Sequence, residues 1–146
     1  MVVSNHSVTV IIPSVRNHEE LDIVLKGLSN QTYSGPCEIV VVGPTNDPGK
    51  KICEKNNIQF IDDEGSRTRA DACNIAINGT ESELILFTDD DVIVPNDWVE
   101  KLVSWFSIEE VSGVGGPNFA PVKESTMWQQ VIDVAFCSTI FTAGTN

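Results

Sequence analysis

Basic residues are scarce in this sequence. Its 146 residues include 9 Lys and Arg against 21 Asp and Glu, a formal net charge of −12 with a sequence pI near 4.3. Binding to a nucleic-acid backbone needs a basic face, so the composition argues against nucleic acid as a partner. An anionic ligand would have to be held locally, by a metal ion, a few Arg side chains or a helix N-terminus.

Cysteine and histidine are also few. The four cysteines are far apart and form no CxxC pair: Cys37, Cys53, Cys73 and Cys137. That spacing excludes a disulfide framework, and we expect reduced, mostly buried thiols of an intracellular protein. His6 and His18 have no metal-ligand partner nearby in the sequence, so we expect both on the surface.

A targeting segment is lacking as well. The first apolar run, Val8 to Ile12, is too short for a signal peptide or a membrane span, and no basic region precedes it. The length suits one domain with a real core, and 41% hydrophobic with 21% charged residues is ordinary globular composition. We therefore expect a soluble, cytoplasmic chain.

Strand-like and helix-like segments alternate along the sequence. β-branched and apolar runs predict strands at 8–12, 38–42, 58–61, 84–88 and 111–116. Capping residues and helical apolar spacing predict helices that begin near Asn17, Pro48, Ala70 and Asn96. In the first helix the apolar face is Leu21, Val24, Leu25 and Leu28, and in the fourth it is Trp98, Val99, Leu102, Val103 and Phe106. The alternation predicts a mostly parallel sheet covered by helices on both faces.

The last segment, 123–146, has a different character. A helical stripe is formed by Trp128, Val131, Ile132, Ala135 and Phe136. Such a stripe could pack on the domain, face a membrane or contact sequence beyond this chain, and we expect it to pack on the domain.

An acidic cluster, Asp89-Asp90-Asp91, follows the apolar run at 84–87. Neighbouring carboxylates repel one another, and a divalent cation is the usual way to neutralise them. If the segment is extended, Asp89 and Asp91 project to one side and Asp90 to the other. Oxygen ligands suit Mg²⁺ or Mn²⁺, and ligands of open α/β sheets bind beyond the carboxyl ends of the strands. The cluster therefore predicts a metal or phosphate site, and the alternative is a solvated turn whose Asp residues cap the segment that follows.

Several segments, in this order and spacing, resemble the nucleotide-sugar-binding half of an inverting family 2 glycosyltransferase. They are Val8–Pro13, Leu28–Tyr33, Glu38–Val42, Asn74–Ile77, the DxD motif at Phe87–Asp91, and Pro95–Trp98. The resemblance implies an α/β fold of the GT-A type, a Rossmann-like three-layer sandwich with a mostly parallel central sheet. It also implies a nucleotide-sugar-binding domain at 1–122 and the start of a truncated acceptor-side region at 123–146.

The resemblance implies transfer of a sugar, with inversion, from a nucleoside diphosphate sugar to the hydroxyl of an unidentified glycan or lipid-linked acceptor. Mn²⁺ or Mg²⁺ would bridge the diphosphate. By this analogy Asp91 is the best metal ligand, Asp89 contacts the metal, ribose or nucleotide, and Asp90 belongs to the nucleotide-sugar site with a less defined role.

Other site residues follow from the same resemblance. The loop after the first strand, with Pro13, Ser14 and Arg16, would cradle the nucleoside, although Arg16 could equally be a solvated charge. Arg67 and Arg69 precede a helix and could bind phosphate bidentately. Arg69 is the better candidate, and the alternative for both is a salt bridge to Asp62, Asp63 or Glu64.

Two positions depart from the family pattern. An acidic residue that reads the base often follows the second strand, whereas here Gly43-Pro44 does. Asp47 and Asn46 are the candidates from the loop for that role, and the alternative for Asp47 is a cap of the next turn. Cys73 stands where an Arg commonly precedes Asn74, which leaves the phosphate contact to Arg67 or Arg69.

The catalytic base is not evident in this sequence. After Asp91, no acidic residue lies in a Glu-Asp motif of the kind that supplies the base in this family. We expect the base beyond residue 146, where membrane-associated sequence could place the protein at the cytoplasmic face of a membrane. The alternative functions are a nucleotidyltransferase and a magnesium-binding phosphotransfer signalling module.

Overall fold

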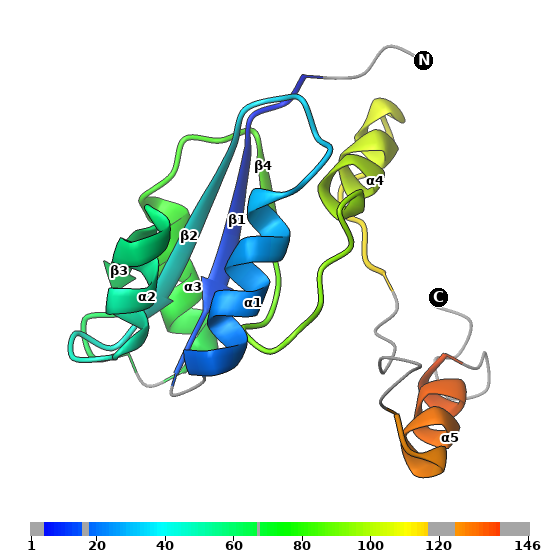
Figure 1. Ribbon diagram of the computed structural model, residues 1–146. Helices are drawn as coiled ribbons and strands as arrows, with labels where there is room; N and C mark the ends of the chain where they lie inside the picture. Colours follow the sequence, from blue (N-terminus) through cyan, green and yellow to red (C-terminus); the bar gives the residue numbers. More distant parts are fainter. Residues whose placement is uncertain (1–4, 16–17, 67, 117–124, 138–146) are drawn as a thin grey trace. The chain divides into compact units, whose positions relative to one another are not determined.

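The computed structural model describes residues 5–15, 18–66, 68–116 and 125–137. The chain divides into two compact units, Met1–Val111 and Ser112–Asn146. The first unit holds the sheet and the helices α1 to α4, and the second holds α5 (Figure 1).

The first unit is built on a four-stranded sheet. The strands are β1 (Val8–Pro13), β2 (Cys37–Gly43), β3 (Gln59–Asp62) and β4 (Leu84–Phe87), in the order β3-β2-β1-β4. Every neighbouring pair is parallel, and β1 aligns with β2 from Val8↔Cys37 to Pro13↔Val42. Central strands of parallel sheets are buried on both faces, which explains the continuous apolar run of β1. The predicted parallel sheet is confirmed.

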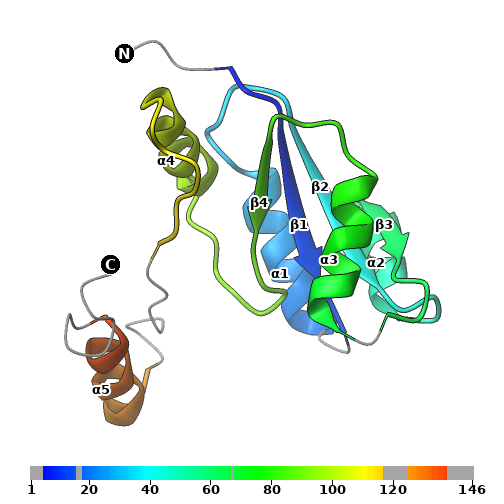
Figure 2. The same cartoon turned by 180° about the vertical axis from the view of Figure 1, so that it is seen from behind.

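Helices cover both faces of this sheet. They are α1 (His18–Ser29), α2 (Gly49–Asn56), α3 (Arg69–Asn78) and α4 (Trp98–Ser104), the last followed by a short 3₁₀ turn, Trp105–Ser107. Figure 1 shows α1 and α2 in front of the sheet, and Figure 2, from behind, shows α3 on the opposite face. Two buried clusters correspond to these layers. One contains side chains from α1, α2 and α4, and the other joins Ala72 and Ala76 of α3 to Ile11, Val40 and Val42.

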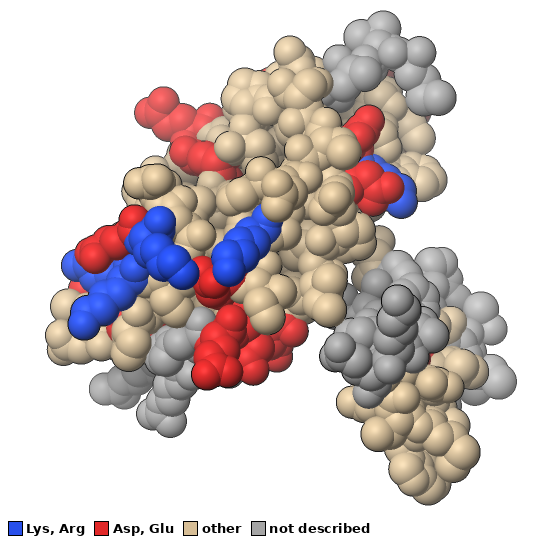
Figure 3. Space-filling model, viewed as in Figure 1, with Lys and Arg blue, Asp and Glu red and all other residues tan. Residues whose placement is uncertain are grey.

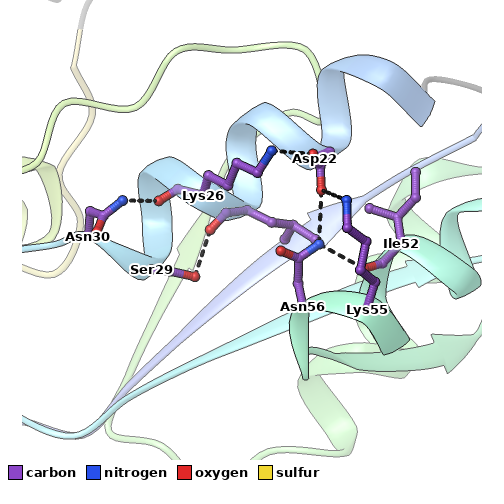
Figure 4. A network of polar contacts seen from close by, with 8 residues as sticks. Asp22, Lys26, Ser29, Asn30, Ile52, Lys55 and Asn56 are labelled. Atoms are coloured by element: carbon purple, nitrogen blue, oxygen red, sulfur yellow. Dashed lines mark hydrogen bonds and ion pairs between the residues drawn. The ribbon is translucent and has the colours of Figure 1, made fainter.

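The predicted apolar face of α1 is confirmed, because all four of its residues are buried. The polar face of α1 contacts α2 (Figure 4). Asp22 accepts a hydrogen bond from Lys26 Nζ at 2.5 Å and one from Asn56 Nδ2 at 3.0 Å, and Lys55 Nζ lies 3.6 Å away. The hydrogen bond from Lys26 is the main cause that lowers the pKa of Asp22 to about 2.

Basic side chains do not form a continuous surface on the face seen in Figure 3. They gather over α1 and α2, the latter carrying Lys50, Lys51 and Lys55, and acidic side chains lie close by.

Three local predictions were wrong. Helix α4 begins after Asp97 rather than Asn96, and neither the Asp97 nor the Asn96 side chain makes a described cap bond; the Asn96 carbonyl instead accepts from Thr32 N at 2.7 Å. Residues 111–116 do not form a strand, since their three glycines disfavour one. The four cysteines are thiols without a disulfide bond, as predicted, but only Cys53 is buried. The predicted Asn17 cap lies outside the described residues.

The second unit contributes one described helix, α5 (Met127–Phe136). A capping box starts it, with Thr126 accepting from Gln129 N and the Gln129 side chain accepting from Thr126 N. The predicted helix is confirmed, and Trp128 on it is 70% exposed. Its packing on the domain stays a prediction. In the parts of the chain that the structure describes, no helix has the length and apolar character needed to cross a membrane.

Candidate functional site

A pocket of about 260 Å³ opens at the carboxyl ends of the strands. Ligands of parallel α/β sheets bind at this edge. Figure 2 shows α3 beginning at the same end of the sheet. The pocket is lined by residues from the ends of β1 and β2, the loop after β3, the start of α3 and the acidic cluster: Pro13, Ser14, Val15, Val42, Gly43, Asp63, Ser66, Thr68, Arg69, Ala72 and Asp90.

Ser14 connects the end of β1 to the acidic cluster. Its backbone N donates to Val42 O at 2.9 Å, which extends the β1–β2 pairing by one residue. Its Oγ donates to Asp90 Oδ2 at 2.7 Å, and the residue is 1% exposed. The predicted site residues Pro13, Ser14 and Asp90 therefore lie together in the pocket wall.

Gly43 leaves no space for a side chain at the end of β2. A Cβ atom built on it would lie 2.4 Å from Ser14 O, well inside van der Waals contact, and 3.5 Å from Phe60 Cζ. An acidic residue at this position would separate the ends of β1 and β2. The close approach gives a steric reason for the departure from the family pattern noted in the sequence.

Arg69 pairs with the first Asp of the cluster. It is the first residue of α3, whose N-cap Thr68 accepts from Asp71 N at 3.1 Å. The Arg69 guanidinium forms an ion pair with Asp89 Oδ1, an enclosed atom that receives no hydrogen bond of good geometry. Arg69 therefore balances the charge of Asp89.

The alternative pairing of Arg69 with the loop acids is not found among the described residues. Asp62 accepts from Glu64 N at 2.8 Å, and Asp63 accepts from Gly65 N at 2.9 Å. The Thr45 side chain is the main cause that lowers the pKa of Asp62. Arg16 and Arg67, the other predicted cations of the site, lie outside the described residues.

The acidic cluster does not continue the strand. β4 ends at Phe87, and Asp90 and Asp91 lie in a turn. The extended alternation predicted for Asp89 to Asp91 is therefore wrong, because the backbone turns after the strand. Asp90, expected to face away, lines the pocket, and Asp91 is exposed.

Asp63 was missed as a site residue in the sequence. It is 5% exposed and lines the pocket directly after β3. Asp47, considered for the base-reading role, instead accepts from Gly49 N at 2.7 Å beside the start of α2 and does not line the pocket. Asn46 is exposed and does not line it either. The position of Asp63 at the carboxyl end of a neighbouring strand was a signal that could have found it.

Cys73 lies one turn after Arg69 on α3. Burial raises the pKa of its thiol, and the Arg69 guanidinium partly offsets this effect. A neutral thiol cannot replace an Arg in binding phosphate, so Arg69 is the described cation of the pocket wall.

Comparison with known proteins identifies the family. Residues 9–143 match the family model described as glycosyl transferase family 2. The chain belongs to this family. A curated relative, an N-acetylglucosaminyltransferase of Azorhizobium caulinodans, is 31% identical over 137 residues, which are 88% of this chain and 34% of the relative.

Solved structures confirm the α/β fold of the GT-A type. A mannosyltransferase from Pyrobaculum calidifontis in complex with GDP-Man and Mn²⁺ superimposes with a TM-score of 0.68 at 24% identity, over 77% of this chain and 36% of that one. Glucosyl-3-phosphoglycerate synthase from Mycobacterium tuberculosis, in complex with Mn²⁺, UDP and glucosyl-3-phosphoglycerate, gives 0.56 at 15% identity, over 70% and 38%. The chain spans about a third of the length of these relatives.

Proposed function

We propose that the pocket binds the nucleoside diphosphate sugar of a family 2 glycosyltransferase, with Mn²⁺ or Mg²⁺ held by the DxD motif. In the whole protein the sugar would pass with inversion to an acceptor hydroxyl, and the base would come from sequence beyond residue 146. The observation that carries the proposal is the Ser14–Asp90 hydrogen bond of 2.7 Å, which brings the nucleoside loop and the acidic cluster into one pocket.

The donor set fits a hard divalent cation. No group of three or more His, Cys, Asp or Glu side chains within the described residues is arranged to hold a metal by itself. Mg²⁺ typically takes one or two carboxylates and completes its shell with water and substrate phosphates. Asp91 is exposed and could serve as one such ligand. Asp89 could serve as the second if its Oδ1 exchanged the Arg69 guanidinium for the cation.

Each side chain has a role in this proposal. Pro13 and Ser14 bound the nucleoside, and Ser14 holds Asp90 in place. The cation, when bound, supplies charge stabilisation for the leaving nucleoside diphosphate. Arg69 is placed to exchange its contact with Asp89 for a bidentate contact with a phosphate, which would leave Asp89 available as a ligand.

The proposal also assigns parts of the chain to the donor and acceptor sides and the protein to a compartment. We assign residues 1–122 to donor binding and 123–146 to the start of the acceptor side. The four cysteines are thiols without a disulfide bond, which supports a reducing compartment such as the cytoplasm. The GDP-Man, UDP and Mn²⁺ bound by the two solved relatives support a nucleotide donor and a divalent cation here.

Calorimetric titration tests the donor site. UDP, GDP and their sugar conjugates are titrated into the chain with Mn²⁺ and again with EDTA. We expect binding that requires Mn²⁺ and weakens about tenfold or more in Asp91→Ala, because a charge-assisted contact is lost. Asp97→Ala is the matched control, since Asp97 pairs with Lys101 at 2.8 Å and does not line the pocket.

The control and the metal dependence decide the outcome. Binding that is equally strong with EDTA and in Asp91→Ala would show that the acidic cluster holds no catalytic metal. A folded chain that binds no nucleotide would contradict the donor-site assignment itself.

A further inference from the structure

Asp63 is a buried carboxylate in the pocket wall with no role assigned to it so far. We propose that it reads the nucleobase of the donor and selects a base that carries a ring N–H, namely uracil or guanine. This inference rests on the proposed donor site and adds to it the chemical class of the base.

The backbone around Asp63 holds its carboxylate in a fixed orientation. Asp63 N donates to Gly43 O at 2.9 Å, which ties the residue to the end of β2. Ser66 N donates to Asp63 O at 2.8 Å, and Gly65 N donates to Asp63 Oδ1 at 2.9 Å. The turn places Glu64 at φ 53° and Gly65 at φ 74°. A positive φ is uncommon for a residue such as Glu64, and such strained positions cluster at functional sites.

One carboxylate oxygen of Asp63 is available to a ligand. Oδ1 is engaged by Gly65 N, and no donor among the described residues contacts Oδ2. A carboxylate only accepts hydrogen bonds. Asp63 is 5% exposed in the pocket wall, and its Oδ2 is not among the enclosed oxygens without a partner in the described residues, so it keeps some access to solvent. A ligand that covers this oxygen would have to offer it an N–H donor, because burying an acceptor without a donor is unfavourable.

The position of Asp63 matches the base end of a nucleoside diphosphate. Asp63 follows β3 at one edge of the sheet, and Asp89 follows β4 at the other edge. Neighbouring strands lie about 4.8 Å apart, so the three intervals span about 14 Å. That distance suits a ligand whose diphosphate lies beside Asp89 and Arg69 and whose base reaches Asp63. Gly43 lies between them and can carry no side chain, so β2 supplies no base-reading group.

The hydrogen-bonding groups on the bases explain why Asp63 would select uracil or guanine. Uracil N3 and guanine N1 each carry a hydrogen that a carboxylate can accept. Cytosine N3 and adenine N1 present a lone pair at the corresponding position, which a carboxylate repels. A site built around a buried acceptor rejects ligands that lack the matching donor, because its polar group would then be left unpaired.

The test compares four nucleotides on two variants. UDP, GDP, CDP and ADP are titrated by calorimetry with Mn²⁺ into the wild type, Asp63→Asn and the matched control Asp62→Asn. Asn at position 63 can still accept from Gly65 N through its amide oxygen, while its amide nitrogen offers a donor to the base. Asp62 accepts from Glu64 N and does not line the pocket.

We expect the wild type to prefer UDP or GDP to CDP and ADP by about tenfold or more. Asp63→Asn should weaken the binding of the preferred nucleotide by about tenfold to a hundredfold and strengthen the binding of CDP or ADP. Asp62→Asn should leave the affinity for all four nucleotides unchanged. UDP methylated at N3 tests the same contact without a variant, since it removes the donor hydrogen. If UDP is preferred, the methylated form should bind about tenfold more weakly. If GDP is preferred, GDP methylated at guanine N1 is the probe in place of methylated UDP.

Other outcomes would overturn the inference. An unchanged preference in Asp63→Asn, or an equal loss for all four nucleotides, would show that Asp63 does not read the base. If Asp91→Ala abolishes binding while Asp63→Asn keeps the preference, the base assignment fails and the donor site stands. Absence of binding for every nucleotide would overturn both.

Discussion

Replacing Gly43 with Ala should destabilise the fold and disrupt the pocket together. The added methyl would lie 2.4 Å from the Ser14 carbonyl oxygen, and the contact is with backbone, not with a flexible side chain. Comfortable packing needs a separation of about 3.5 Å. The ends of β1 and β2 would therefore have to move apart by about 1 Å.

The size of the stability loss in Gly43→Ala follows from the contacts around Gly43. Overpacking of this kind costs about 1–3 kcal/mol. The movement also strains two hydrogen bonds of 2.9 Å, Ser14 N to Val42 O and Asp63 N to Gly43 O, each worth about 1 kcal/mol net. We expect a loss of about 2–4 kcal/mol in the free energy of unfolding. Nucleotide binding should fall with it, because Ser14 and Asp63 both move.

Urea denaturation followed by circular dichroism measures the stability change, and calorimetry measures binding. Gly113→Ala is the control for an added methyl, since nothing lies within 4 Å of a Cβ atom there. A Gly43→Ala protein within about 0.5 kcal/mol of the wild type would refute the reasoning, because the strand ends would then have room that the structure does not show.

Two further predictions concern polar contacts away from the pocket. The lowered pKa of Asp22, about 2 against the ordinary 3.8, means that its contacts stabilise the fold above pH 3.8 and are lost as the pH falls towards 2. The difference in melting temperature between the wild type and Asp22→Asn should therefore shrink over that range, and a constant difference would contradict this. Thr9 is fully buried and its hydroxyl contacts Glu38, Thr80 and Ser82 at 2.5, 2.6 and 2.8 Å. Thr9→Val should cost about 1–3 kcal/mol in urea denaturation, more than Thr9→Ser, which keeps the hydroxyl.

The sheet and its helices could be predicted because the spacing of apolar residues along the sequence follows which side chains are buried. The run at 8–12 is apolar at nearly every position, as a strand covered on both faces requires, and the four apolar positions of α1 are its buried face. The segment 111–116 failed because a strand needs a neighbour as well as apolar residues, and Val111 and Val114 are separated by glycine and serine. The prediction of mostly buried cysteines failed because the exposure of a side chain depends on tertiary packing, which the spacing of four residues in the sequence does not indicate.

The site was predictable only where it follows directly from the end of a strand. Pro13 and Ser14, at the end of β1, line the pocket as expected of such positions, whereas Asp90 lines it although strand alternation predicted that it would face away. The orientation of the acidic cluster was not predictable, because strand alternation stops where β4 stops, at Phe87. Asp63 was missed for another reason. It lies among Asp62, Asp63 and Glu64, and only the turn with two positive φ angles separates its buried role from that of its neighbours.

Electrostatics gives a reason beyond the motif for the proposed metal requirement. Charges farther apart than about 8 Å are largely screened at physiological ionic strength, so the net charge of −12 matters less to a ligand than the side chains that line the pocket. Those charges are Asp63 and Asp90 against Arg69, and Arg69 is already paired with Asp89. A diphosphate entering this pocket would meet a surplus of negative charge. A cation that binds the acidic cluster would reverse that balance and free the Arg69 guanidinium for the phosphates, so nucleotide and metal should bind cooperatively.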